Sequence, residues 1–212
     1  MKQLVLLLVI TLPMLGQSRY SRRYPQHNLT GSFGAGLPRG DLKPFFGDSF
    51  GLSASYGYRF HEYFQADAGF DTVFHAARVK DFFETQVGDL RIRDYQYFVP
   101  VGGRAILPLA RGRVLFFGGG GGAYMRYQES IRQPFGDAYF RIECRVCRAR
   151  SGWGHYALAG TNVFLDRRKM VRFGFTTKVY RGNTSGEAFG ALPAFRTRDQ
   201  WINTFAEFGV SF

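Results

Sequence analysis

Apolar and polar residues alternate at every second position over long stretches of this chain, and that pattern limits the fold more than any other feature. In FQADAGFDTVFH, Phe64, Ala66, Ala68, Phe70, Thr72 and Phe74 alternate with Gln65, Asp67, Gly69, Asp71, Val73 and His75. The segments 50–60, 171–179 and 201–212 repeat the alternation. Because the side chains of a β-strand point alternately to its two faces, period two predicts strands with one apolar and one polar face. We therefore expect an all-β chain.

Runs of this kind predict eight strands. They lie near residues 29–38, 49–60, 63–76, 94–107, 113–127, 153–165, 170–181 and 199–212. Each is about ten residues or longer, which is the length that a tilted strand needs to cross a bilayer. Strands of soluble proteins are commonly nearer about five or six residues. The fifth and sixth strands alternate poorly, so the pattern leaves their facing open.

The connections between these strands alternate between short and long. Those after the second, fourth and sixth strands are the short HE, PLARG and DRRK. Those after the odd-numbered strands are PRGDLKPFFGD, RVKDFFETQVGDLRIR, the stretch around 128–152 and GNTSGEAFGALPAFRTR. Short turns at one rim and long loops at the other, with an even number of strands, are typical of outer-membrane barrels. We predict an eight-stranded antiparallel up-and-down transmembrane β-barrel over residues 29–212.

The first residues carry the features of an export signal. MKQLVLLLVITLPMLGQS has one lysine, an apolar run from Leu4 to about Leu15, and small residues at Gly16 and Ser18 that fit a cleavage site. The run is shorter than the roughly 20 residues of a membrane-spanning helix. We expect residues 1–18 to be a cleaved signal peptide and residues 19–28, RYSRRYPQHN, to be a flexible basic segment. Since no long apolar stretch follows, the exported chain is either soluble or a membrane barrel.

The chain ends on FAEFGVSF, with apolar residues at alternate positions up to the last one. Together with the even strand number, the loop alternation and the signal peptide, this ending resembles the small bacterial outer-membrane β-barrel families, OmpA-like and OmpW-like. The resemblance extends over nearly the whole mature chain, and the ending is its one local motif. It implies that the barrel-assembly machinery recognises Phe208, Val210 and Phe212 as a C-terminal assembly signal. It also implies a location in the bacterial outer membrane.

Alternation by itself does not say which stripe faces the inside of the barrel. The polar set combines glycine and serine with a few charged residues, and a narrow eight-stranded lumen is filled by such small and polar side chains. We expect the apolar set to face lipid and the polar set to form a lumen network. Its charged members are Asp67, Asp71, Arg104, Arg172, Lys178 and Glu207. Asp67 and Arg104 should lie at similar depth and pair, because an isolated charge would be costly there. The alternative is separate hydration of each charge in a wet lumen.

Aromatic residues gather near the predicted strand ends, as they do in the two interfacial girdles of membrane barrels. The first predicted girdle comprises Tyr56, Tyr58, Phe60, Tyr63 and Phe64. The second comprises Tyr95, Tyr97, Tyr124, Tyr127, Tyr180 and Trp201.

Other residues with reactive side chains do not form a recognisable catalytic or metal motif. Cys144 and Cys147 predict a local disulfide in an oxidising compartment, with two free thiols as the alternative. The glycine run 118–122 lacks the strand-to-helix context of a phosphate loop. Ser151 and His155, four apart on a strand, would lie about 13 Å from each other, too far for a catalytic hydrogen bond. We expect no enzymatic activity, no cofactor and no metal.

The net charge of +12 comes from 28 basic and 16 acidic residues. Nucleic acid is one possible partner class for so basic a chain, but the arginines are spread along its whole length. Contact with anionic lipid fits this distribution at least as well. The arginines around 128–152 are candidates for bidentate contacts with lipid phosphates, and a solvated loop without a partner is the alternative.

The function that fits these features best is non-enzymatic. We expect a monomeric outer-membrane barrel with a side-chain-filled lumen and a structural or surface-contact role through its long loops. Lipopolysaccharide or other surface ligands are the expected loop partners, and no nucleic acid. An OmpW-like conduit for small apolar molecules is the main alternative. A soluble secreted β-barrel that binds an apolar ligand is the second.

Overall fold

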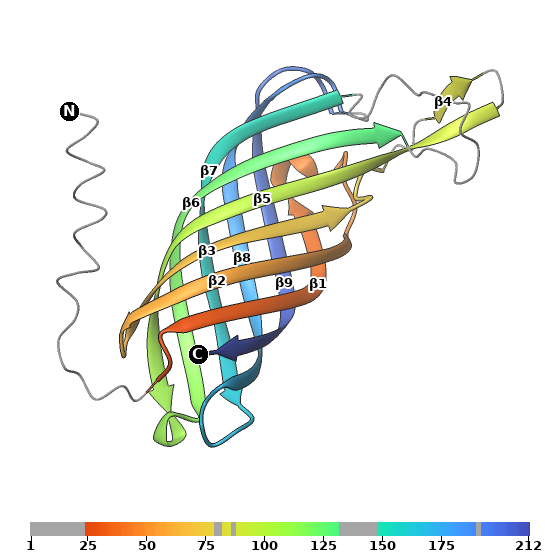
Figure 1. Ribbon diagram of the computed structural model, residues 1–212. Coiled ribbons are helices and arrows are strands. Elements are labelled where there is room, and N and C mark those ends of the chain that lie inside the picture. Colours follow the sequence, from red (N-terminus) through yellow and green to blue (C-terminus); the bar gives the residue numbers. More distant parts are fainter. Residues whose placement is uncertain (1–23, 79–81, 86–87, 132–147, 190–191) are drawn as a thin grey trace, which may run out of the picture.

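The strands of the chain close into one antiparallel barrel (Figure 1). The computed structural model describes residues 24–78, 82–85, 88–131, 148–189 and 192–212. Within them the barrel strands are β1 His27–Arg39, β2 Ser49–His61, β3 Phe64–Phe74, β5 Gly88–Leu109, β6 Val114–Ile131, β7 Arg148–Phe164, β8 Val171–Gly186 and β9 Thr197–Ser211. Each pairs with its neighbour in sequence, and the pairings β1–β9 and β3–β5 complete the circle. The predicted eight-stranded up-and-down barrel is confirmed.

A ninth strand lies outside the barrel wall. β4, Phe82–Thr85, pairs with residues 88–91 of β5 and makes a hairpin in the connection from β3 to β5. The sequence predicted a plain loop there and started the following strand at residue 94, so β5 is longer than expected. At the opposite rim, β5 and β6 are joined by η2, Ala110–Gly112, and β7 and β8 by residues 165–170.

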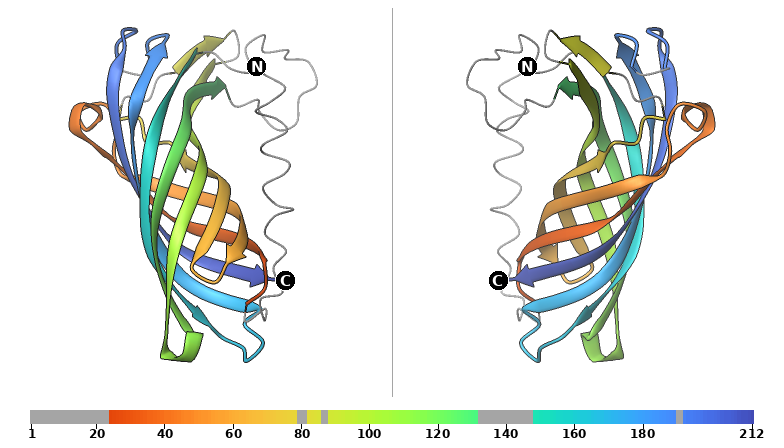
Figure 2. Two further views of the ribbon diagram at one scale, coloured as in Figure 1. Left: turned by 90° about the vertical axis from the view of Figure 1, so that its left-hand side faces the viewer. Right: turned by 90° about the vertical axis from the view of Figure 1, so that its right-hand side faces the viewer.

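The turn rim and the loop rim lie at opposite ends of the barrel (Figure 2). β1 and β9 pair along their length and close the barrel. At the turn rim the backbone N–H of His27 donates to Phe212 and that of Phe212 donates to His27, each over 2.9 Å. β1 begins two residues before the predicted start, and the Tyr24 side chain just ahead of it is buried. No helix in the described ranges is long and apolar enough to cross a membrane.

The glycine run lets β5 and β6 approach each other closely where both strands bend (Figure 1). A Cβ on Gly119 would lie 2.1 Å from the carbonyl oxygen of Gly103, and one on Gly121 would lie 2.2 Å from that of Val101. Any larger residue at these two positions would collide with the neighbouring backbone. Wall curvature therefore explains part of a run that sequence searches associate with phosphate loops.

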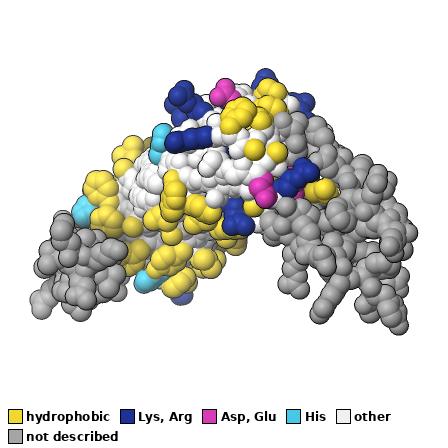
Figure 3. Space-filling model, turned by 90° about the horizontal axis from the view of Figure 1, so that it is seen from above, with side chains coloured by type: hydrophobic (Ala, Val, Ile, Leu, Met, Phe, Trp, Pro, Cys, Tyr) yellow, Lys and Arg dark blue, Asp and Glu magenta, His cyan; other side chains and the backbone are white. Residues whose placement is uncertain are grey.

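In the strands with clear alternation, the apolar stripe faces outward and the polar stripe inward, as predicted. Phe70, Phe175 and Phe208 are 45%, 53% and 54% exposed on the outer wall, whereas Asp71 is fully buried inside. Hydrophobic side chains lie along the outside of the barrel (Figure 3). Exposing apolar area to water is unfavourable. A barrel with an apolar outer wall is therefore suited to a hydrocarbon environment.

The predicted second aromatic girdle is partly wrong. Tyr127, Tyr180 and Trp201 have no exposed surface and point into the barrel. Trp201 occupies the same stripe as Asn203 and Glu207, and Tyr180 the same stripe as Lys178. The pleat fixes this facing whatever the side chain is. Tyr95, Tyr97 and Tyr124 remain partly exposed on the outer wall, and Trp153, which the prediction omitted, is 73% exposed.

Candidate functional site

The interior of the barrel and the loops that enter it are the candidate functional site. Its half nearer the turns, here called the turn-end lumen, has a polar part and an apolar part. The apolar part consists of Ile106, Leu115, Phe117, Leu158 and Phe164. The polar side chains are Asn28, Arg59, Gln65, Asp67, Arg104, Arg172 and Glu207. They come from β1, β2, β3, β5, β8 and β9, so most of the wall contributes.

A chain of hydrogen bonds runs across the turn-end lumen. Arg104 Nε donates to Asp67 Oδ2 over 2.6 Å, and both side chains are less than one tenth exposed. Gln65 Nε2 donates to the other oxygen of Asp67 over 2.6 Å, and Asn28 Nδ2 donates to Gln65 Oε1 over 3.2 Å. Arg172 donates to Asn28 Oδ1 and completes the chain. The structure thus brings together Asp67 and Arg104, the pair named from the sequence.

A second ion pair lies further up the lumen. Lys178 Nζ contacts Asp71 Oδ1 over 2.7 Å. The same carboxylate accepts hydrogen bonds from Ser53 Oγ over 2.7 Å and from the Tyr180 hydroxyl over 2.6 Å. Three donors on a carboxylate without solvent contact satisfy most of its lone pairs. Because β3 and β8 are not neighbours in the sheet, this pair ties opposite walls of the barrel together.

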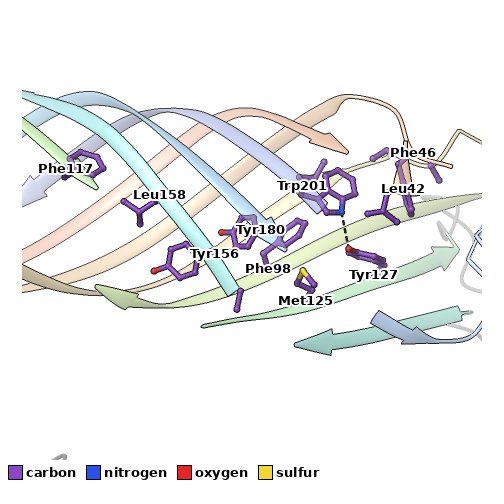
Figure 4. Packing of buried hydrophobic residues seen from close by; sticks show 14 of the residues in the cluster. Leu42, Phe46, Phe98, Phe117, Met125, Tyr127, Tyr156, Leu158, Tyr180 and Trp201 are labelled. Carbon is purple, nitrogen blue, oxygen red and sulfur yellow. Dashed lines mark hydrogen bonds between the residues drawn. The ribbon is translucent and has the colours of Figure 1, made fainter. Parts of the chain in front are cut away.

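Above this pair the lumen becomes aromatic (Figure 4). Phe98 stacks on Tyr180 with ring centroids 4.6 Å apart, and Trp201 lies edge-on to Phe98 at 5.7 Å. Trp201 Nε1 donates to the Tyr127 hydroxyl over 3.0 Å, so the indole N–H is satisfied in an apolar setting.

Two loops fill the remaining space at the loop end. Leu42 and Phe46 come from the β1–β2 connection, and Phe189 and Leu192 come from the β8–β9 connection; each is at most 1% exposed. The Phe46 ring lies 5.6 Å from that of Trp201 and 5.8 Å from that of Phe189. The loops therefore close the barrel with apolar side chains of their own.

Arg150 holds the β8–β9 loop in this position. Its guanidinium donates to the backbone oxygens of Pro193 and Phe195, over 2.9 and 3.2 Å, and to Thr184 and Thr197. Both threonine hydroxyls donate in turn to the buried carboxylate of Asp199. The sequence placed Arg150 in a loop, because the poor alternation of β7 led the prediction to start that strand at residue 153.

The interface between β3 and β5 contains an irregularity. The paired register runs from Phe64–Ala105 to Ala68–Val101 and resumes at Asp71–Phe98. Between these lies Pro100, which has no N–H to donate to the ladder. A groove of about 490 Å³ lies beside this interface, lined by Phe60, Phe64, Gln65, Ala66, Gly102, Gly103, Arg104, Ala105, Gly118 and Gly119.

All six charged residues of the predicted lumen network face the interior and are shielded from solvent. The structure pairs four of them as Asp67–Arg104 and Asp71–Lys178. Arg172 is hydrogen-bonded to neutral oxygens, and Glu207 lies within electrostatic range of it. The prediction missed Arg59, although it lies in the polar stripe of β2 and its alternation with Tyr58 and Phe60 marks it as inward-facing.

The other residues weighed from the sequence do not assemble into a site. Ser151 and His155 belong to the outward stripe of β7 with Trp153. Cys144 and Cys147 fall outside the described residues, as does the predicted signal peptide. Among the described residues, no group of three or more His, Cys, Asp or Glu side chains is placed to hold a metal ion.

Comparisons with known proteins relate the chain to membrane barrels by fold. No family model matches the sequence, and no curated protein matches it. Neisserial surface protein A is similar in structure, with a TM-score of 0.52 and 10% identity over 88% of this chain and 97% of that one. The outer membrane protein OprG from Pseudomonas aeruginosa is also similar, with a TM-score of 0.52 and 14% identity over 89% and 97% of the two chains. The chain has the fold of the small outer-membrane β-barrels.

Proposed function

We propose that this protein is an integral outer-membrane barrel that is closed to conduction and acts through its loop-end surface, in a structural or surface-contact role. The proposal involves no catalysis. The observation that carries it is the combination of an apolar outer wall with inward side chains that are buried at the turn end, in the middle and at the loop end of the lumen. The first feature suits a bilayer, and the second removes the path that a channel needs.

The outer wall supports the membrane location. Large apolar side chains are exposed on the outward stripes of every barrel strand, with Phe33, Val101 and Leu107 each nearly 60% exposed. A soluble monomer rarely exposes apolar patches of this extent. The mature chain should therefore need detergent to stay in solution and should migrate differently in gels with and without heating. Detergent-free solubility would instead support a secreted ligand-binding barrel.

The closed lumen supports a role other than transport. The interior contains two ion pairs, a hydrogen-bonded polar chain and an aromatic plug to which two loops contribute. In planar bilayers the reconstituted barrel should give no conductance above background, with a large porin as the positive control. Stable, ion-selective steps of conductance would refute the closed-lumen proposal.

The loop-end surface supports contact with an anionic partner. Six basic residues are exposed on this side of the described chain, namely Lys43, Arg78, Arg148, Arg181, Arg196 and Arg198. The exposed acidic residues there are Asp41, Asp48 and Glu187. Arginine binds phosphate in a bidentate manner, so the partner class that fits is a phosphate-bearing surface lipid such as lipopolysaccharide.

A charge-matched pair of variants tests this partner. Replacing Arg181, Arg196 and Arg198 by glutamine should weaken binding of the reconstituted barrel to lipopolysaccharide and reduce its salt dependence. Replacing Arg111, Arg113 and Arg167, which are exposed at the turn rim, changes the net charge equally and should leave binding unchanged. Equal losses in both variants would mean that only net charge matters.

A lateral conduit for small apolar molecules is the second candidate, and the irregularity at Pro100 favours it. An interrupted ladder is where a barrel wall separates most easily. The groove lies along the same β3–β5 interface, over the paired residues 64–66 and 102–105. In liposome flux experiments, Pro100→Val should restore a donor and reduce any uptake of an apolar dye. Uptake that is the same with and without the protein would exclude the conduit.

A further inference from the structure

The turn-end lumen contains more positive than negative charge. Its inward-facing cations in the described chain are Arg59, Arg104 and Arg172, and its inward-facing anions are Asp67 and Glu207. Arginine stays protonated inside proteins, so deprotonation cannot remove the excess. The Asp67–Arg104 pair is neutral by itself. Within the turn-end lumen Glu207 is then the one remaining carboxylate of the described residues, and it acts on Arg172.

Neither Arg59 nor Arg172 is in contact with a carboxylate of the described residues. The guanidinium of Arg172 donates to Asn28, Ser211 and Thr30, all of which are neutral acceptors. That of Arg59 lies over the Tyr24 ring, 4.6 Å from its centroid. Glu207 attracts Arg172 without forming an ion pair of the usual length with it. At the turn rim, Glu62 also attracts Arg59, and Lys169 lies 4.1 Å from the same Tyr24 ring.

Each of these two arginines also has a buried donor without an acceptor. The Nε atoms of Arg59 and Arg172 have no hydrogen-bond partner, although the side chains are only 6% and 5% exposed. A buried N–H of a charged group is costly to leave unsatisfied. Native proteins fill such positions with water or an ion.

The two arginines are linked through the first residues of β1. Asn28 accepts from Arg172, and the Gln26 carbonyl, which accepts from the Asn28 amide, also accepts the backbone N–H of Arg59. Arg59 and Arg172 thus lie on either side of the first residues of β1. The charges of Arg59, Arg104 and Arg172 are close enough to repel one another. A water molecule would satisfy the two N–H groups but would leave this repulsion in place.

From these observations we propose that the turn-end lumen binds a small inorganic anion of the chloride type between Arg59 and Arg172. The anion accepts the two free Nε–H groups and neutralises the excess positive charge. This site concerns the stability of the barrel and is independent of what the loops contact. Its failure would leave the proposed surface role untouched.

Bromide is the probe for locating the anion. Crystals of the mature barrel grown in sodium bromide should show an anomalous peak within contact distance of Arg59 Nε or Arg172 Nε. A map with water alone at both atoms, or with Glu207 moved into contact with Arg172, would overturn the proposal.

Thermal unfolding in solution tests the same site, because two variants should change the stabilisation by chloride in opposite directions. The midpoint of thermal unfolding of the detergent-solubilised barrel should rise by about 3 °C in sodium chloride over sodium gluconate at equal ionic strength, since gluconate is too large to enter. Arg172→Gln should abolish this difference, and Glu207→Gln, which increases the positive excess, should enlarge it. Arg181→Gln, on the outward stripe of the same strand, is the matched control and should leave it unchanged. Equal chloride effects in all four proteins would refute the site.

Discussion

The ion pair between Asp71 and Lys178 offers the sharpest test of the energetic role of the lumen. Asp71→Asn keeps the shape of the side chain and one acceptor oxygen, so that only one of the Ser53 and Tyr180 hydroxyls, which donate to different oxygens of Asp71, keeps its acceptor. The variant also leaves the Lys178 ammonium without its counter-charge. Lys178 is 5% exposed, so water cannot readily replace the carboxylate. Removing one partner of a buried pair costs about 3–5 kcal/mol. We expect the free energy of unfolding to fall by that amount.

A double variant separates the effect of the lost counter-charge from the effect of changed packing. Lys178→Met in the Asp71→Asn background removes the stranded charge and retains the side-chain volume. Replacing a buried pair by neutral groups of similar size is often close to neutral in stability. The double variant should therefore regain most of the lost stability, to within about 1–2 kcal/mol of the parent. The exposed pair Arg39–Asp48, separated by 3.9 Å, is the control, and Asp48→Asn should cost under about 1 kcal/mol.

Urea unfolding in phospholipid vesicles, followed by tryptophan fluorescence, measures these differences. Trp201 is buried in the aromatic cluster and reports opening of the lumen directly. The reasoning is refuted if Asp71→Asn alone is as stable as the parent. It is equally refuted if adding Lys178→Met brings no recovery, because the loss would then come from something other than the stranded charge.

Three further predictions concern the outer wall, the loop and a turn. Phe175→Arg places a charge on the outward stripe of β8 and should lower the free energy of unfolding in lipid by about 2–4 kcal/mol near the bilayer centre, as measured by urea unfolding. Thr161→Ser, at the position of β7 that pairs with Phe175, should lower it far less. Arg150→Gln removes the donors to Pro193 and Phe195 and should make the β8–β9 loop cleavable by trypsin at Arg196, while Arg148→Gln should not. The backbone N–H groups of Val171 and Met170 lower the pKa of Asp166 at the β7–β8 turn. That stabilisation is present above the ordinary carboxyl pKa and is lost as the pH falls through the lowered one; hydrogen exchange at Val171 should quicken there, and Asp166→Asn should remove the pH dependence.

The alternation of apolar and polar residues predicted correctly which side chains face the lumen, because the direction of a side chain depends on the local geometry of the strand. Phe208 and Glu207 take opposite sides of β9 since the pleat requires it. Composition near strand ends was a weaker guide. It assigned Trp201 and Tyr180 to an outer girdle, although their positions in the stripe placed them with Asn203 and Lys178. Where the two criteria disagreed, the structure followed the alternation.

The first and last residues of a strand could not be predicted well where the alternation fails. The glycines of β6 and β7 carry no polarity signal, so the prediction started β7 at residue 153 and missed Arg150 as an inward residue. The hairpin formed by β4 was missed for a related reason: four residues are too short a run for period two to stand out.

The sequence by itself determined that this chain forms long two-faced strands joined by alternating turns and loops, because strand pleat and turn length are properties of neighbouring residues. Only the tertiary structure decided that Asp71 meets Lys178 across the barrel, that Phe46 and Phe189 close the loop end, and that Arg59 and Arg172 are linked through the start of β1. Those contacts depend on the stagger of eight strands around a closed circle. No short segment contains that information.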